Sequence, residues 1–229
     1  MGSRSYSQVR PAPAASLPPR PFPFLTKGMP EHSKVMGKDW AADRRKANVA
    51  RLGAALAEAL AGRDELTFEI GCGHGHWLAA YAAAHPAEYC VGIDLITHRV
   101  ERSQRKQRLG QLANVAFFKA EATEFLDALA PGQKLAKVFI LYPDPWPKKR
   151  HHKNRFINEA NLARLAAHAP TGATLHFRTD DEAYHAWTRE HLERHPQWRL
   201  VADAPWPFER TTFFEDMMKA KRDLTAVRR

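Results

Sequence analysis

Short apolar runs alternate with helix-patterned segments along most of this chain, and this alternation limits the possible folds more than any other feature. Seven runs have the length and composition of strands: residues 66–70, 89–94, 115–118, 138–141, 173–178, 198–202 and 224–227. Helical spacing is found at residues 38–61, 76–84, 98–111, 122–129, 156–168 and 182–194. The pattern predicts an α/β fold with a doubly wound, mostly parallel, seven-stranded sheet. We expect the first helix to be amphipathic and to pack against the sheet edge.

The N-terminal segment differs in composition from the rest of the chain. It holds prolines at positions 11, 13, 18, 19, 21 and 23 but no continuous apolar stretch, so it does not read as a secretory signal. We expect residues 1–28 to form a flexible, proline-rich basic tail, and residues 29–229 to form a single domain.

The overall charge indicates the kind of partner. The formal net charge is +10, and cations that cluster usually mark a polyanionic partner. Cys72 and Cys90 are the two cysteines, so we expect no disulfide framework and a reducing, cytoplasmic setting. The histidines show no metal-ligand spacing, and no apolar run approaches membrane-spanning length, so we expect neither a metal nor a membrane segment.

The most unusual stretch begins where the fourth predicted strand ends. Asp144 and Trp146 stand between three prolines and are followed by a basic run, residues 148–155. Proline lacks a backbone N–H and restricts the residue before it, so this stretch should be a stiff, irregular loop. Ligands bind at the carboxyl ends of strands in an open α/β sheet. We therefore interpret the loop as a functional segment rather than as a plain turn. Trp146 either stacks on a base or packs beneath the loop.

A glycine-rich loop follows the first predicted strand. Gly71 and Gly73 permit a sharp turn and close approach of a nucleoside ligand, whereas His76 stands where a dinucleotide fingerprint has Gly or Ala. Glu69, two residues before the loop, suits a ligand that carries positive charge, such as S-adenosylmethionine. Asp94 ends the second strand, where an acid can bind ribose hydroxyls or begin a helix. Glu121 follows the third, where an acid can accept from an adenine amino group or be a first-turn helix charge.

These motifs resemble those of the bacterial tRNA (guanine-N7)-methyltransferases, which have the Rossmann-like class I S-adenosylmethionine-dependent fold. The resemblance extends from about Leu66 to Glu215. It rests on the Pro143–Trp146 motif with Lys148 and the basic run, on residues 69–73 and 92–94, and on Thr179-Asp180 and residues 212–215. This chain has Glu121 where the family commonly has Asp, and Asp94 where the family commonly has Glu.

The resemblance implies a reaction, and it implies a role in that reaction for each matching residue. Asp144 would be the catalytic residue, and the cofactor-binding residues would be Glu69, Gly71, Gly73, Asp94, Glu121 and Asp144. The substrate guanosine would meet Lys148, Asp180, Thr212 and Glu215, and RNA would contact Arg150, His151, His152, Lys153, Asn154 and Arg155. The implied activity is methyl transfer from S-adenosylmethionine to N7 of the variable-loop guanine 46 of tRNA, by a monomer or weak homodimer.

Other interpretations stay open on the residues alone. The chain could methylate a different substrate, or it could be a non-catalytic RNA-binding module. The basic run beside Asp144 argues against a small-molecule enzyme, and the retained acids argue against an inactive module. The cationic segment with Arg99, Arg102, Arg105, Lys106 and Arg108 either meets phosphates or is a solvated helix face.

Overall fold

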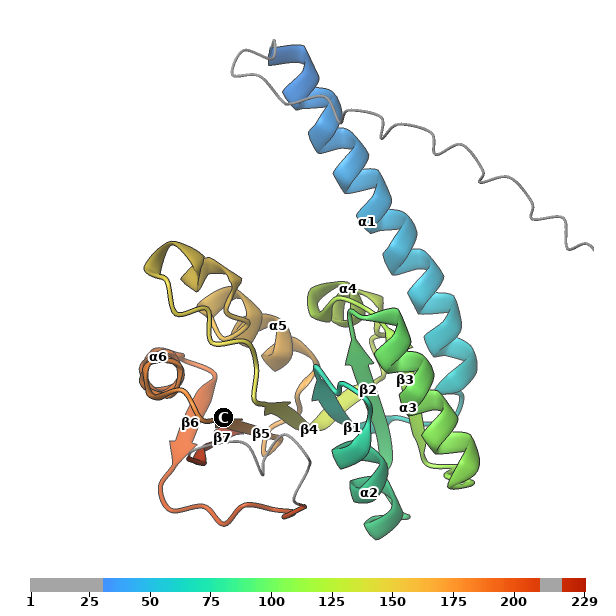
Figure 1. The fold of residues 1–229 in the computed structure, drawn as a ribbon, viewed down its shortest axis with the longest axis vertical. Helices are drawn as coiled ribbons and strands as arrows, with labels where there is room; N and C mark the ends of the chain where they lie inside the picture. The colour runs from blue at the N-terminus through green and yellow to red at the C-terminus, as the bar shows by residue number, and fades with distance from the viewer. Residues whose placement is uncertain (1–30, 211–219) are drawn as a thin grey trace, which may run out of the picture. The chain divides into compact units, whose positions relative to one another are not determined.

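A computed structural model of the chain describes residues 31–210 and 220–229 (Figure 1). By their internal contacts, residues 1–41 and 42–229 form two separate units. The helix α1, Glu31–Ala59, begins in the first unit, and its residues from Ala42 onward belong to the second. The predicted tail, residues 1–28, lies outside the described residues. Its boundary with the domain therefore stays a prediction.

Seven strands form one sheet in the order β3-β2-β1-β4-β5-β7-β6. Their bounds are β1 Glu65–Ile70, β2 Tyr89–Asp94, β3 Val115–Lys119, β4 Lys134–Leu141, β5 Thr174–Thr179, β6 Trp198–Val201 and β7 Arg222–Arg228. All neighbouring strands from β3 to β5 pair in parallel, whereas β7 is antiparallel to both β5 and β6. The predicted doubly wound, mostly parallel seven-stranded sheet is confirmed.

Helices cover both faces of this sheet (Figure 1). They are α2 His76–Ala84, α3 Thr97–Leu109, α4 Ala122–Ala128, α5 Glu159–His168 and α6 Glu182–Arg194, with a 3₁₀ helix, η1, at Lys149–Asn154. Apolar residues of α2 and α3 share one core cluster, and those of α4, α5 and α6 share the other. Within β4, Phe139 belongs to the first and Ile140 to the second, as the alternation of strand side chains requires.

The first helix differs from its prediction in where it packs. Leu52, Leu56 and Leu60 are buried in the same cluster as Phe68 of the central strand β1. The C-terminal part of α1, together with Leu60 just after it, therefore packs on a face of the sheet, in the same apolar cluster as α4 and α5, and the expected packing at the sheet edge is wrong. The physical reason is that leucines at helical spacing bury more apolar surface against a sheet face than against an edge.

Several predicted boundaries also needed correction; α1, for example, begins at Glu31 instead of residue 38. Helix α5 begins at Glu159 instead of residue 156, because Asn158 is its N-cap and accepts a hydrogen bond from the Asn161 backbone N–H at 3.0 Å. Strand β4 begins at Lys134, four residues before its apolar run. Its polar first half is stabilised in part by an ion pair between Lys137 and Glu88. Among the described residues, no helix is long and apolar enough to cross a membrane.

Candidate active site

A cavity of about 480 Å³ opens at the carboxyl ends of the parallel strands. This size falls within the range of small-molecule binding sites. Its walls come from the ends of β1, β2 and β4, from the segments that follow β1, β2, β3 and β4, and from residues of α5 and α6. Of the predicted site residues, those lining the cavity are Gly71, Asp94, Glu121, Asp144, Lys153, Asn154 and Arg155. The sheet topology thus brings together three acids that are far apart in the sequence.

The glycine loop between β1 and α2 has room for a ligand on one side and is tightly packed on the other. Gly71 has a φ of 77°, which favours glycine, and a Cβ added there would meet no atom within 4 Å. At Gly75 an added Cβ would lie 2.6 Å from the Cβ of Ser103 in α3. The loop is therefore fixed against α3 by Gly75 and open at Gly71, which lines the cavity.

Glu69 lies directly before this loop and is 3% exposed. Its Oε2 atom has no hydrogen-bond partner among the described residues. Burial, together with the neighbouring carboxylate of Asp94, raises the pKa of Glu69 to about 8. A buried acid with an unpaired oxygen is an unfavourable arrangement unless a donor or a positive charge arrives. This observation fits the cationic ligand expected from the sequence.

Asp94 connects the end of β2 to the glycine loop. Its Oδ2 accepts a hydrogen bond from the Gly73 N–H at 3.1 Å, and its Oδ1 accepts one from the Ile96 N–H at 2.8 Å. Arg99 forms a longer ion pair with Oδ2, at 3.8 Å. Each carboxylate oxygen can accept more than one hydrogen bond, so both remain competent to accept from a diol in the cavity.

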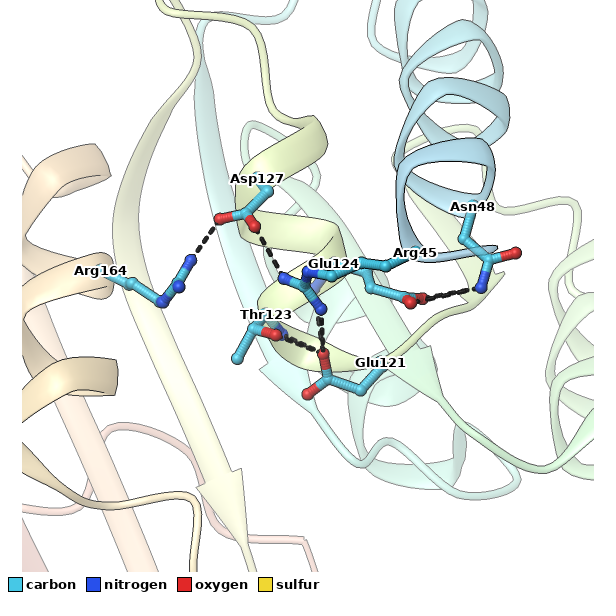
Figure 2. A network of polar contacts seen from close by, with 7 residues as sticks. All are labelled: Arg45, Asn48, Glu121, Thr123, Glu124, Asp127 and Arg164. Carbon is cyan, nitrogen blue, oxygen red and sulfur yellow. Dashed lines mark hydrogen bonds and ion pairs between the residues drawn. The ribbon is translucent and has the colours of Figure 1, made fainter. Parts of the chain in front are cut away.

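Glu121 is the N-cap of α4 and is also part of a polar network that joins three helices. Figure 2 shows its Oε2 accepting from Thr123, while Arg45 of α1 lies between Glu121 and Asp127. Asp127 also pairs with Arg164 of α5. Among the described residues, the hydrogen bonds and the ion pair of Glu121 are made through Oε2, so Oε1 can still accept a hydrogen bond. The helix-capping and cavity-lining interpretations are therefore compatible.

Asp144 lies on an exposed loop whose backbone is strained on both sides of it. Tyr142 and Trp146 each have a φ of 47°, in the left-handed region that bulky residues rarely adopt. The Tyr142 N–H donates to the Arg178 carbonyl at 2.7 Å, so the pairing with β5 continues to the start of the loop. Trp146 packs edge-on against His151 of η1, with ring centroids 5.9 Å apart. The loop places Asp144 at the wall of the cavity.

Arg155 does not lie where the sequence suggested. We expected an RNA contact, but Arg155 is 2% exposed and its Nε donates to the Pro145 carbonyl at 2.9 Å. Its guanidinium lies over the rings of Tyr184 and Trp187 in α6, at 4.7 and 5.2 Å from their centroids. The prediction is corrected: a residue buried in this way fastens the Asp144 loop to α6 and is not part of the exposed basic surface.

The other residues of the basic run are exposed to different degrees. Lys148, Arg150, Lys153 and Asn154 are exposed. His151 and His152 are half-buried because they pack on Trp146 and Trp187, respectively. The run forms η1, so its cations are presented by a short helix that follows the loop.

Asp180 follows β5 and is exposed, but it is not among the described residues that line the cavity. Its carbonyl accepts a hydrogen bond from Arg222 at 2.9 Å. Thr212 and Glu215 lie outside the described residues. Of the part of the site expected to bind the guanosine, the described cavity therefore contains the Asp144 loop. No group of histidine, cysteine or acidic side chains in the described ranges could hold a metal ion.

Comparison with proteins of known structure agrees with this fold. The aminoglycoside resistance methyltransferase NpmB1 superposes with a TM-score of 0.54 at 16% identity, over 77% of this chain and 93% of that one. The 16S rRNA methyltransferase KamB superposes with a TM-score of 0.53 at 13% identity, over 77% and 94%. These similarities show that the chain has the Rossmann-like fold that these two methyltransferases share.

Sequence comparison then gives the family. A family model described as a putative methyltransferase matches residues 63–225. A tRNA (guanine-N(7)-)-methyltransferase from Rhodopseudomonas palustris is 34% identical over 71% of this chain and 66% of its own length. One from Rhodospirillum rubrum is 34% identical over 69% and 62%, and one from Agrobacterium fabrum is 32% identical over 72% and 75%. The chain belongs to the tRNA (guanine-N7)-methyltransferase family, and it spans about two thirds of the length of these relatives.

Proposed function

We propose that this protein transfers a methyl group from S-adenosylmethionine to N7 of a guanine in tRNA, at the variable-loop position 46. The observation that carries the proposal is the joint placement of Asp94, Glu121 and Asp144 around one cavity at the strand ends. Family membership supports the choice of tRNA as substrate and of guanine N7 as the methylated atom. We expect a monomer or a weak homodimer that works in the cytoplasm.

The residues present fit the proposed cofactor. S-adenosylmethionine supplies an activated methyl group on a sulfonium, and it also carries an ammonium group. The unpaired, buried Oε2 of Glu69 would become an acceptor beside this positive charge. Gly71 leaves space for close backbone approach, Asp94 would accept from the ribose hydroxyls, and Oε1 of Glu121 would accept from the adenine amino group.

Asp144 would act on the base. Guanine N7 has a free lone pair, so its methylation requires no general base and depends on holding the base in line at near-attack distance. Positive charge develops on the purine as the methyl group arrives. A fixed carboxylate near the ring would stabilise that charge or accept hydrogen bonds from guanine N1–H and the exocyclic amine. The left-handed backbone at Tyr142 and Trp146 supports this role because it restricts the loop that carries the carboxylate.

The exposed cations after Asp144 would meet the RNA backbone. Lys148, Arg150 and Lys153 follow the loop at and within η1, and Lys153 also lines the cavity. Phosphates bound there would orient the nucleotide that enters the site. Binding that depends on such contacts weakens steeply with added salt.

The test is a methylation assay with identification of the product. The protein is incubated with labelled S-adenosylmethionine and an unmodified tRNA transcript, and the RNA is then digested to nucleosides. We expect the label in 7-methylguanosine, and none with a matched transcript that has adenosine at position 46. Label in another nucleoside would refute the proposed reaction, and equal label in the two transcripts would refute the proposed position.

A further inference from the structure

One face of α3 carries a row of cations beside the glycine loop. Arg99, Arg102 and Lys106 are spaced by three and four residues, which places them on the same side of the helix. The Lys106 Nζ lies 2.9 Å from His76 Nδ1 and donates to the His74 carbonyl at 3.2 Å. These five residues and Arg210 are called the α3 patch below.

The positive charge of the α3 patch is poorly balanced. Among the described residues, only Arg99 of this set has an acidic partner, Asp94, and that ion pair is long, at 3.8 Å. Burial lowers the pKa of His74, and the charges of Arg102, Arg99 and Lys106 lower it further. Burial and the nearby Arg210 lower the pKa of Lys106 in the same way. Cations that repel one another without acidic partners favour binding of an external anion.

The other exposed cations of α3 differ in position. Arg105 and Arg108 are exposed, and by helical geometry Arg108 lies nearly opposite the row of Arg99, Arg102 and Lys106, with Arg105 between the two sides. Within the part of the chain described, neither forms a hydrogen bond or ion pair with the glycine loop. The cationic helix seen in the sequence is therefore divided into a face directed toward the loop and a solvated face.

The α3 patch and the basic run flank the same cavity. Arg99 lines it from the α3 side, and Lys153 lines it from the side of the loop after β4. In the sheet, β2 and β4 lie on either side of β1, so the segments following them approach the cavity from two directions. A polynucleotide that places one base in the cavity would have phosphates on both sides of that nucleotide.

We propose that the α3 patch is a second contact surface for the RNA backbone, separate from the basic run after Asp144. The inference rests on the proposed function, because it takes the polyanion to be the tRNA whose guanine enters the cavity. Side chains that carry a row of charge along a helix match a strand of regularly spaced phosphates better than they match a single small anion. The surface positions the RNA and takes no part in the reaction itself.

The experiment compares two charge reversals on the same helix, Arg102→Glu and Arg108→Glu. Both residues are exposed, both changes alter the charge equally, and neither residue is placed in the catalytic machinery. The dissociation constant of unmodified tRNA is measured by fluorescence anisotropy at several salt concentrations, and S-adenosylmethionine binding is measured by calorimetry. The milder Arg102→Gln is included to measure how many phosphates Arg102 neutralises.

We expect Arg102→Glu to weaken tRNA binding by about 10-fold or more and Arg108→Glu to change it by less than about 2-fold. Arg102→Gln should reduce the slope of log K against log salt by about one. Cofactor affinity should stay unchanged in all three variants. Equal effects of the two reversals, or no effect of either, would overturn the inference while wild-type methylation stood. A wild-type protein that neither binds nor methylates tRNA would instead overturn the proposed function.

Discussion

The two sides of the cavity hold their acids by different means. On the side proposed to bind the cofactor, Asp94 and Glu121 accept hydrogen bonds from backbone N–H groups in the glycine loop and at helix starts, so the fold itself fixes them. On the loop side, Asp144 is exposed, and its position depends on left-handed backbone at Tyr142 and Trp146 and on Arg155 behind the loop. Because of this difference, we expect substitutions near Asp144 to alter the rate of methyl transfer. We expect substitutions at Asp94 and Glu121 to alter cofactor binding and the stability of the fold.

The largest effect is expected from Asp144→Ala. The side chain lies on an exposed loop outside the core, so the fold should be preserved while the carboxylate is lost from the cavity. We expect kcat/KM for methyl transfer to fall by about 100-fold to 1000-fold, measured as label incorporated into tRNA. Circular dichroism and the melting temperature serve as folding controls. Near-normal turnover would remove Asp144 from its catalytic role.

A smaller loss of activity is expected from Arg155→Lys. Lysine cannot both donate to the Pro145 carbonyl and stack its head group on Tyr184 and Trp187, so the loop should shift. We expect kcat to fall by about 10-fold to 100-fold, with a much smaller change in KM for tRNA.

The matched control for Arg155 is Lys153→Met, two residues earlier in the basic run. Lys153 is exposed, so its removal should raise KM for tRNA and reduce the salt dependence while kcat stays nearly constant. If both variants changed only KM, Arg155 would belong with the RNA-binding cations after all.

On the cofactor side, Glu121→Ser separates the two contributions of Glu121. Serine is a good N-cap, so α4 should keep its capping hydrogen bonds, but its side chain is too short to place an acceptor in the cavity. We expect the affinity for S-adenosylmethionine, measured by calorimetry, to fall by about 10-fold. Glu124→Gln, which changes a carboxylate that bonds Asn48, is the control and should leave cofactor affinity unaltered. If the affinity for S-adenosylmethionine were unchanged in both variants, Glu121 would act as a helix cap and would not bind the cofactor.

An effect on stability alone, and not on activity, is expected from the pH dependence due to Glu69. Its pKa is raised from 4.5 to about 8 by burial, so between these values the folded protein retains a proton that the unfolded chain has released. The free energy of unfolding should therefore decline as pH rises through this range. Urea unfolding at several pH values should show a flatter dependence for Glu69→Gln. Parallel curves for the two proteins would contradict the raised pKa.

The sequence predicted the bounds of helices and strands correctly where glycine or proline residues mark their ends. Helix α2 and strand β2 have the predicted bounds, because Gly71, Gly75 and Pro86 mark clear ends. It was insufficient where a polar residue has a distant partner, as with Lys137 at the start of β4, whose ion pair with Glu88 is made across the sheet. Hydrophobic periodicity within one segment carries no information about ion pairs between residues that are distant in the sequence.

The site shows the same limit. Acids at strand ends could be predicted to converge, because all parallel strands end at one edge of the sheet. Arg155 could not be distinguished from the other cations of its run, because what buries it are Tyr184 and Trp187, about one helix and one strand further along the chain. Tyr184 also lines the cavity, yet in the sequence it is one aromatic residue among several in an amphipathic helix.

The left-handed backbone at Tyr142 and Trp146 has a consequence for the thermodynamics of RNA recognition. A loop that became ordered only on contact with its substrate would lose conformational entropy at every binding event. Here the torsions on both sides of Asp144 are already fixed in the folded chain. The entropy lost on association should therefore come mainly from the RNA, whose variable loop must adapt to a surface that hardly changes.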